Sequence, residues 1–113
     1  MATIKAYTDL EQSKKLAEIL PLESADICYV CGNTILNLHT KYGDTSIEEL
    51  YKKHIIPAWS LAALLNILPS ATLDSSDDHH YRVHCNERFT EWYDNAIDAC
   101  VAMIEKLHEL NLL

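Results

Sequence analysis

Two cysteines separated by two residues, Cys28 and Cys31, have a spacing that zinc sites use in proteins. Thiolates at this spacing supply half of a structural zinc site, which needs four ligands. The other ligands would have to come from residues that do not repeat the spacing, namely His39, His80, His84 or Cys85. Because the segment reads as a strand, in which residues three apart point to opposite faces, we expect free thiols here. A small zinc-binding module through Cys28 and Cys31 is kept as an alternative function.

A second group of titratable residues precedes and opens a strand-like run in the second half of the chain. It comprises His79, His80, His84, Cys85, Asp74, Asp77 and Asp78. On a strand, His80 and His84 would share a face but lie about 13 Å apart, too far to bind one ion together. We expect a solvated acidic loop that leads into a strand. His80 and His84 join the two cysteines as metal candidates, and we predict no bound metal or cofactor.

No pair of residues has the arrangement of a nucleophile and its base. Cys85 follows His84 directly, and neighbours on a strand face apart. Cys100 falls on the apolar stripe of the last predicted helix, where packing is its expected role. Only two glycines occur, Gly32 and Gly43, which excludes a glycine-rich phosphate-binding loop. We predict no catalytic residues and a protein that is not an enzyme.

Aromatic and acidic residues are the remaining candidates for function. Core packing is the expected role of the large aromatic side chains, whereas an exposed aromatic cluster would indicate a recognition surface. The candidates for contacting a partner are His39, Asp77, Asp78, Tyr81 and Trp92.

Composition limits the classes of partner. The chain has 113 residues, 49% of them hydrophobic, which suits one core, and we predict a single domain over residues 1–113. The net charge is −8, and residues 57–113 hold nine acidic and three basic residues. A net negative charge repels phosphate backbones and anionic lipid headgroups. We therefore expect no direct nucleic-acid ligand and no membrane association. Because the sequence starts without a signal-like apolar run, we expect a cytoplasmic protein.

Capping signals and apolar periodicity predict the helices. A Thr-x-x-Glu box at Thr8 predicts a helix over about 9–20, and a Ser-x-x-Glu box at Ser46 predicts a short helix through about Lys53. The run Pro57–Pro69 is apolar on nearly every side, so we expect a central core helix with its first proline in the first turn. A last amphipathic helix should start at Asp94 or Asn95.

The first predicted hairpin turns at Gly32-Asn33, a dipeptide that suits a two-residue loop. It joins strands over 27–31 and 34–39, which places Val30 opposite Ile35. The second hairpin turns at Asn86-Glu87 and joins strands over 81–85 and 88–93. In this register two pairs of side chains attract each other across the strands, Arg82 with Glu91 and Tyr81 with Trp92. A further short strand is expected over Ala71–Leu73.

These elements predict an α+β fold. Two hairpins can join into one four-stranded, mainly antiparallel sheet, which helices must cover. An α-β-α sandwich is one arrangement that satisfies this.

Three blocks of the sequence carry a resemblance to a known group of proteins: EQSKKLAEILPLESAD (11–26), PAWSLAALLNILP (57–69) and DNAIDACVAMIEKLHELNLL (94–113). They resemble blocks shared by short uncharacterised proteins of gut-anaerobe genomes and their prophages or mobile elements. The order of elements is also similar to the phage domain family described as an α-β-α sandwich. The resemblance implies a phage-like context and carries no catalytic motif.

From these observations we expect a small non-enzymatic interaction or accessory protein of a phage-like or mobile element. Its partner would be a protein that the sequence does not identify, or a second copy of the chain in a homodimer. The alternative from another class is an acidic decoy of a nucleic-acid-binding protein, which requires the carboxylates of 74–109 to line up on one face.

Overall fold

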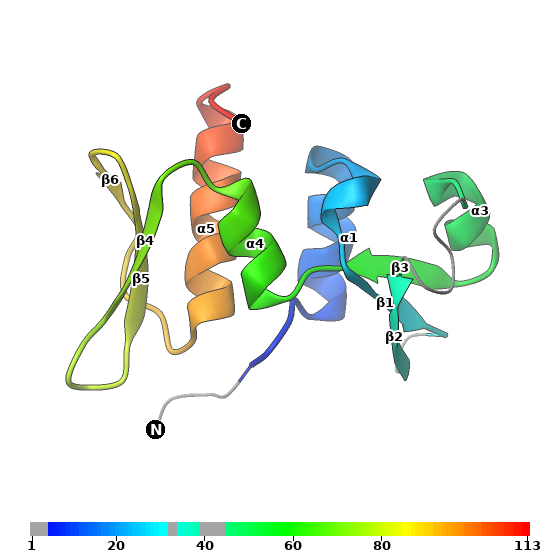
Figure 1. Cartoon of the computed structure of the whole chain (residues 1–113), viewed down its shortest axis with the longest axis horizontal. Coiled ribbons are helices and arrows are strands. Elements are labelled where there is room, and N and C mark those ends of the chain that lie inside the picture. Colours follow the sequence, from blue (N-terminus) through cyan, green and yellow to red (C-terminus); the bar gives the residue numbers. More distant parts are fainter. Residues whose placement is uncertain (1–4, 32–33, 39–44) are drawn as a thin grey trace. The chain divides into compact units, whose positions relative to one another are not determined.

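The computed structural model describes residues 5–31, 34–38 and 45–113. Its elements are α1 (Leu10–Ile19), the 3-10 turn η1 (Leu22–Ser24), β1 (Ile27–Val30), β2 (Thr34–Asn37), α3 (Ile47–Lys52), β3 (Ile55–Ala58), α4 (Leu61–Ile67), β4 (Ala71–Ser75), β5 (Tyr81–Cys85), β6 (Arg88–Phe89) and α5 (Ala96–Glu109) (Figure 1). The mixture of helices and antiparallel strands confirms the predicted α+β class.

The chain divides into two compact units. The N-terminal unit is Tyr7–Ala63, and the C-terminal unit is Leu64–Leu113 together with the segment that ends at Ala6. The boundary falls inside α4. The single domain predicted over residues 1–113 stays a prediction.

The prediction of one four-stranded sheet is wrong for the described residues. They form two three-stranded antiparallel sheets, with strand orders β2-β1-β3 and β4-β5-β6. Each predicted hairpin gains a third strand. In the first sheet this strand is β3, which overlaps the start of the helix expected at Pro57–Pro69, and in the second it is β4, which includes the short strand expected over Ala71–Leu73. The sandwich expected around a joined sheet therefore does not form as predicted.

The apolar run at Pro57–Pro69 is a strand followed by a seven-residue helix. Pro57 lies in β3 opposite Cys28 and is fully buried. Strand β3 lies at the edge of its sheet. Proline has no backbone N–H donor, and an edge strand tolerates this because one of its sides pairs with no other strand. Ser60 then caps α4, since its hydroxyl accepts from the amide of Ala63 at 3.3 Å. The expected central helix is thus about half as long as predicted, and the fully buried residues of the run include Pro57, Ala58 and Trp59, which precede the helix.

The first hairpin has a different register from the predicted one. Val30 lies opposite Thr34 and Tyr29 opposite Ile35, one residue away from the expected pairs. Cys31 has a left-handed backbone with φ 53°, and its amide donates to the carbonyl of His54 at 3.0 Å. Cys31 therefore continues the pairing toward β3 and leaves the pairing with β2. The proposed turn residues Gly32 and Asn33 lie outside the described residues.

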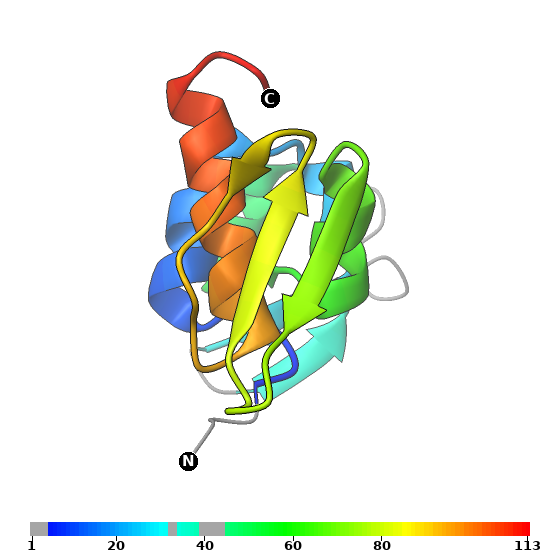
Figure 2. The ribbon, with the colours of Figure 1, turned by 90° about the vertical axis from the view of Figure 1, so that its left-hand side faces the viewer.

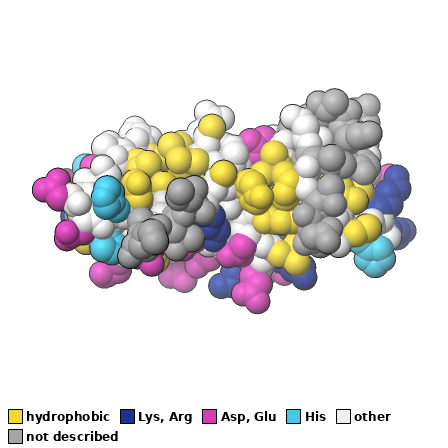
Figure 3. Space-filling view, turned by 90° about the horizontal axis from the view of Figure 1, so that it is seen from below, with side chains coloured by type: hydrophobic (Ala, Val, Ile, Leu, Met, Phe, Trp, Pro, Cys, Tyr) yellow, Lys and Arg dark blue, Asp and Glu magenta, His cyan; other side chains and the backbone are white. Residues whose placement is uncertain are grey.

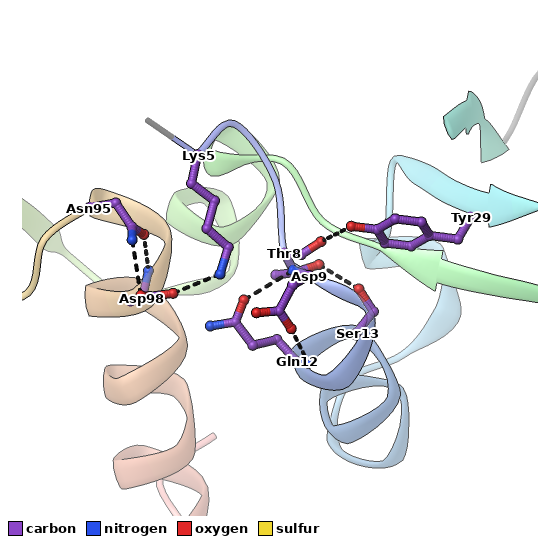
Figure 4. A network of polar contacts seen from close by, with 8 residues as sticks. All are labelled: Lys5, Thr8, Asp9, Gln12, Ser13, Tyr29, Asn95 and Asp98. Atoms are coloured by element: carbon purple, nitrogen blue, oxygen red, sulfur yellow. Dashed lines mark hydrogen bonds and ion pairs between the residues drawn. The ribbon is translucent and has the colours of Figure 1, made fainter. Parts of the chain in front are cut away.

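Helix α1 begins one residue later than the capping box at Thr8 suggests. Asp9 is the cap: its carboxylate accepts from the amide of Gln12 at 2.8 Å, and the Gln12 side chain accepts from the amide of Asp9 at 3.1 Å (Figure 4). The Thr8 hydroxyl is instead fully buried, 2.7 Å from the Ser13 hydroxyl, and accepts from the amide of Trp59 at 3.1 Å. Thr8 thus links the start of α1 to the junction between β3 and α4.

The C-terminal unit packs one helix against one face of its sheet. Helix α5 contacts β5, and Figure 2 shows the sheet with its other face toward the viewer and α5 behind it. Asn95 caps α5 as predicted, with its carbonyl oxygen accepting from the amide of Asp98 at 2.8 Å. Lys5 lies 2.9 Å from the carboxylate of Asp98 and ties the N-terminal segment to this helix (Figure 4). The core of the unit includes Val83, Cys85, Ile97, Cys100, Met103 and Ile104.

Candidate interaction surface

The outer face of the β4-β5-β6 sheet carries polar and aromatic side chains. Along β5, Val83 and Cys85 are buried against α5, so the alternation of a strand places Arg82 and His84 on the opposite face. The antiparallel register brings Asp74 of β4 opposite Arg82, and Phe89 of β6 opposite His84. We call the set Asp74, Arg82, His84, Phe89 and Trp92 the aromatic-arginine surface.

Arg82 is held from three directions on this surface. Its Nε atom lies 3.2 Å from a carboxylate oxygen of Asp74. Its guanidinium carbon lies 4.6 Å from the ring centroids of both Phe89 and Trp92. Each cation-π contact at an exposed site contributes about 0.5–1 kcal/mol. The guanidinium is therefore oriented before any partner arrives.

The two aromatic rings remain open to solvent although they contact Arg82. Phe89 is 45% exposed and Trp92 is 44% exposed. The imidazole of His84 stacks on Phe89 with ring centroids 4.2 Å apart and an angle of 6° between the planes. Exposed aromatic side chains that lie together on a sheet are a feature of recognition surfaces.

A bulge in the strand pairing brings Trp92 next to Arg82. Val83 and Thr90 pair in the predicted register, through Thr90 N to Val83 O at 3.0 Å. Two residues further along, Tyr81 pairs with Tyr93, not with the predicted Trp92, through two hydrogen bonds of 2.7 Å. The segment after β6 therefore holds one extra residue, as in a β-bulge. Arg82 forms its ion pair with Asp74, and the predicted partner Glu91 is exposed.

Negative charge is concentrated near this surface. Residues 74–94 contain six acidic and two basic residues. Acidic and histidine side chains gather at the end of the unit where the turn between β4 and β5 lies (Figure 3). Asp77 and Asp78 are exposed in that turn, and His80 lies 3.4 Å from a carboxylate oxygen of Asp94. The acidic side chains of residues 74–94 form the rim of this surface. Asp74 pairs with Arg82 and Asp94 with His80, and the other carboxylates offer negative charge to a partner.

The four metal candidates are not brought together. Cys28 is fully buried in β1, whereas Cys31 follows the strand and is exposed. His80 pairs with Asp94, and His84 stacks on Phe89 and contacts the carbonyl oxygen of Asn86. Within the described residues, no group of three or more His, Cys, Asp or Glu side chains is positioned to hold a metal ion. The candidate His39 lies outside those residues.

Buried thiols behind the sheet are chemically quiet. Burial raises the pKa of the Cys85 thiol, and burial together with the neighbouring Cys85 raises the pKa of Cys100 to about 12. Both are neutral at physiological pH, so neither has the thiolate character that a nucleophile needs. Their role is to fill the space between β5 and α5.

Sequence reasoning named Trp92 as an interaction candidate but missed Arg82 and Phe89 as members of the surface. The predicted candidate Tyr81 shares the face of β5 that Val83 and Cys85 turn toward α5, so it lies on the opposite side of the sheet from Arg82. The signal was present, because Arg82 and His84 alternate with the apolar Val83 and Cys85. The predicted register also set Phe89 opposite His84, which the structure confirms. The bulge that places Trp92 over Arg82 has no such signal.

No protein-family model, curated protein sequence or solved structure matches the chain. Among the described residues, none of the helices combines the length and the apolar composition needed to cross a bilayer.

Proposed function

We propose that this chain is a small non-enzymatic interaction protein that contacts its partner through the aromatic-arginine surface. The observation that carries the proposal is the guanidinium of Arg82 between two half-exposed rings, 4.6 Å from each. The resemblance of its three sequence blocks supports a place in a phage-like or mobile element. No described contact favours the acidic decoy, whose carboxylates would have to share one face.

The residue types of this surface support a binding role, and so does the fixed conformation of Arg82. Trp and Arg are enriched among the residues that contribute most to the free energy of protein-protein binding. Ordering a flexible arginine on binding costs conformational entropy, and the contacts with Asp74, Phe89 and Trp92 have already ordered Arg82. The surface can therefore bury both rings with little further loss of freedom.

Charge indicates the chemistry of the partner. Six acidic residues against two basic ones over residues 74–94 favour a polypeptide with lysine or arginine around an apolar contact. The apolar part would cover Phe89 and Trp92, and the basic part would lie against Asp77, Asp78 and Glu91. Such a partner is a protein segment, because the same acidic rim repels nucleic acid.

Selection from a random-peptide display library on the purified protein tests the proposal. We expect enriched peptides that combine basic residues with an aromatic or large aliphatic residue. Their affinity, measured by fluorescence anisotropy, should fall about tenfold or more in Trp92→Ala and in Phe89→Ala. Raising the ionic strength should weaken binding, because the rim charges are exposed.

Leu112→Ala is the matched control, since Leu112 is an apolar residue in the same unit with 50% exposure. Its affinity for the selected peptides should equal that of the unchanged protein. Peptides that bind equally well to Trp92→Ala would refute the proposal. Micromolar self-association that disappears in Trp92→Ala, measured by analytical ultracentrifugation, would replace the basic partner with a second copy of the chain.

A further inference from the structure

A groove of about 430 Å³ lies in the N-terminal unit, far in the sequence from the aromatic-arginine surface. Its lining comes from α1, the end of β1, α3 and the start of β3: Leu10, Lys14, Cys31, Tyr51, His54 and Ile56. The volume falls within the range of small-molecule sites in proteins. Leu10, Ile56 and the Tyr51 ring supply apolar contact area.

Backbone geometry fixes one side of the groove. Cys31 and His54 both adopt left-handed conformations, with φ values of 53° and 60°. The amide of Cys31 donates to the carbonyl of His54 at 3.0 Å, which joins the end of β1 to the start of β3. Two residues in this sparsely populated conformation are held by the pairing around them. This hydrogen bond therefore sets the backbones of Cys31 and His54 next to each other in the lining.

The groove is locally basic in an acidic chain. None of the six described residues that line the groove is acidic, whereas the whole chain has a net charge of −8. Within the described residues, the ammonium of Lys14 makes no ion pair or hydrogen bond. Lys52 and Lys53 precede His54 in the sequence, and basic and histidine side chains gather at the end of this unit where α3 lies (Figure 3). The local charge favours an anion.

Tyr51 adds a hydrogen-bond donor to the lining. Burial raises the pKa of its phenol above the usual 10.0, and the nearby carboxylate of Glu18 raises it further. The phenol is therefore neutral at physiological pH and keeps its proton. Glu18 is not among the described residues that line the groove. The imidazole of His54 has at least one N–H donor in either of its protonation states.

We infer that this groove binds a small amphipathic anion, a carboxylate that carries a short apolar chain. The ammonium of Lys14 would meet the carboxylate, assisted by N–H or O–H donors of His54 and Tyr51. The apolar chain would lie on Leu10 and Ile56. This site is independent of the proposed protein-binding surface, which lies in the other unit.

Isothermal titration with octanoate and with octylamine, at equal chain length, tests the inference. Octanoate should bind at least about fivefold more tightly than octylamine, because the two head groups differ in the sign of their charge. Lys14→Met should weaken octanoate binding about twofold to fivefold, the scale of one exposed ion pair. Lys15→Met, which changes the neighbouring and non-lining lysine, should leave octanoate binding unchanged.

Cys31 provides a second readout that does not depend on the affinity of a variant. It is exposed, whereas the other three cysteines are buried, so iodoacetamide should alkylate it first. Octanoate should slow this reaction, as followed by mass spectrometry, and octylamine should slow it less. Equal binding of octanoate and octylamine, or alkylation of Cys31 at the same rate with and without saturating octanoate, would overturn the inference. Neither result would affect the proposal that the aromatic-arginine surface binds peptides through Trp92.

Discussion

The guanidinium carbon of Arg82 lies 4.6 Å from the centroid of the Trp92 ring. The two residues are ten positions apart in the sequence, on β5 and on the segment that follows β6. Their contact depends on the strand pairing that brings these segments side by side. It also depends on the bulge that shifts Trp92 away from its expected position opposite Tyr81. The surface is therefore a product of local strand irregularity.

Replacing Arg82 with alanine should destabilise the fold by about 1–2 kcal/mol. The change removes two exposed cation-π contacts and one partly exposed ion pair, which are worth about 0.5–1 and 0.2–1 kcal/mol each in isolation and are not fully additive. Urea denaturation followed by circular dichroism measures the loss. Arg88→Ala is the matched control on the same sheet and should change the free energy of unfolding by less than about 0.5 kcal/mol. An equal loss in both variants would mean that the rings do not hold Arg82.

Replacing Thr8 with valine should cost about 1–3 kcal/mol, although the two side chains have nearly the same shape. The Thr8 hydroxyl is fully buried and accepts from the amide of Trp59 at 3.1 Å. Without it, that amide and the Ser13 hydroxyl lose a buried partner, and an unsatisfied buried group costs about this much. Thermal or urea denaturation gives the value. Thr72→Val, at an exposed strand position, should be neutral or slightly stabilising.

Sequence reasoning predicted most elements because their signals are local. The caps at Ser46 and Asn95 lie where expected. The second hairpin keeps its predicted register at His84 and Phe89. These features depend on side chains a few residues apart, so neighbouring sequence is enough to specify them.

The errors occurred where partners distant in the sequence decide the structure. Pro57 is compatible with a first helical turn or with an edge strand, and the neighbouring β1 selects the strand. Cys31 leaves the predicted hairpin because the carbonyl of His54 accepts its amide. A one-residue change in register moves every side chain of a strand to the other face. The contact between Arg82 and Trp92 was missed for a different reason, because the bulge that produces it carries no sequence signal.

Replacing Ser70 with glycine should stabilise the protein by about 0.5–1 kcal/mol. Ser70 lies between α4 and β4 with a left-handed φ of 51°, which glycine adopts without the steric cost of a side chain. Ser75→Gly is the opposed control, because Ser75 ends β4 and glycine weakens a strand. The midpoint of urea denaturation should therefore rise in Ser70→Gly and fall in Ser75→Gly. A shift in the same direction would show that the conformation at Ser70 carries no strain.

The stability of the C-terminal unit should fall as the pH rises above about 9. Burial raises the pKa of Cys100 from 9.0 to about 12, so the folded state keeps a proton that the unfolded chain loses between these values. The thiol's contribution is fully present below the unfolded pKa and is lost as the pH approaches the folded one. The slope is about 1.4 kcal/mol per pH unit for one proton. Urea midpoints measured between pH 8 and 11 report this decline. Cys100→Ala should have a lower free energy of unfolding at pH 8 because packing is lost, but this free energy should decline less steeply with pH. Cys31→Ala changes the exposed thiol and should keep the slope of the unchanged protein. Parallel slopes for all three proteins would show that Cys100 ionises as easily in the folded state as in the unfolded chain.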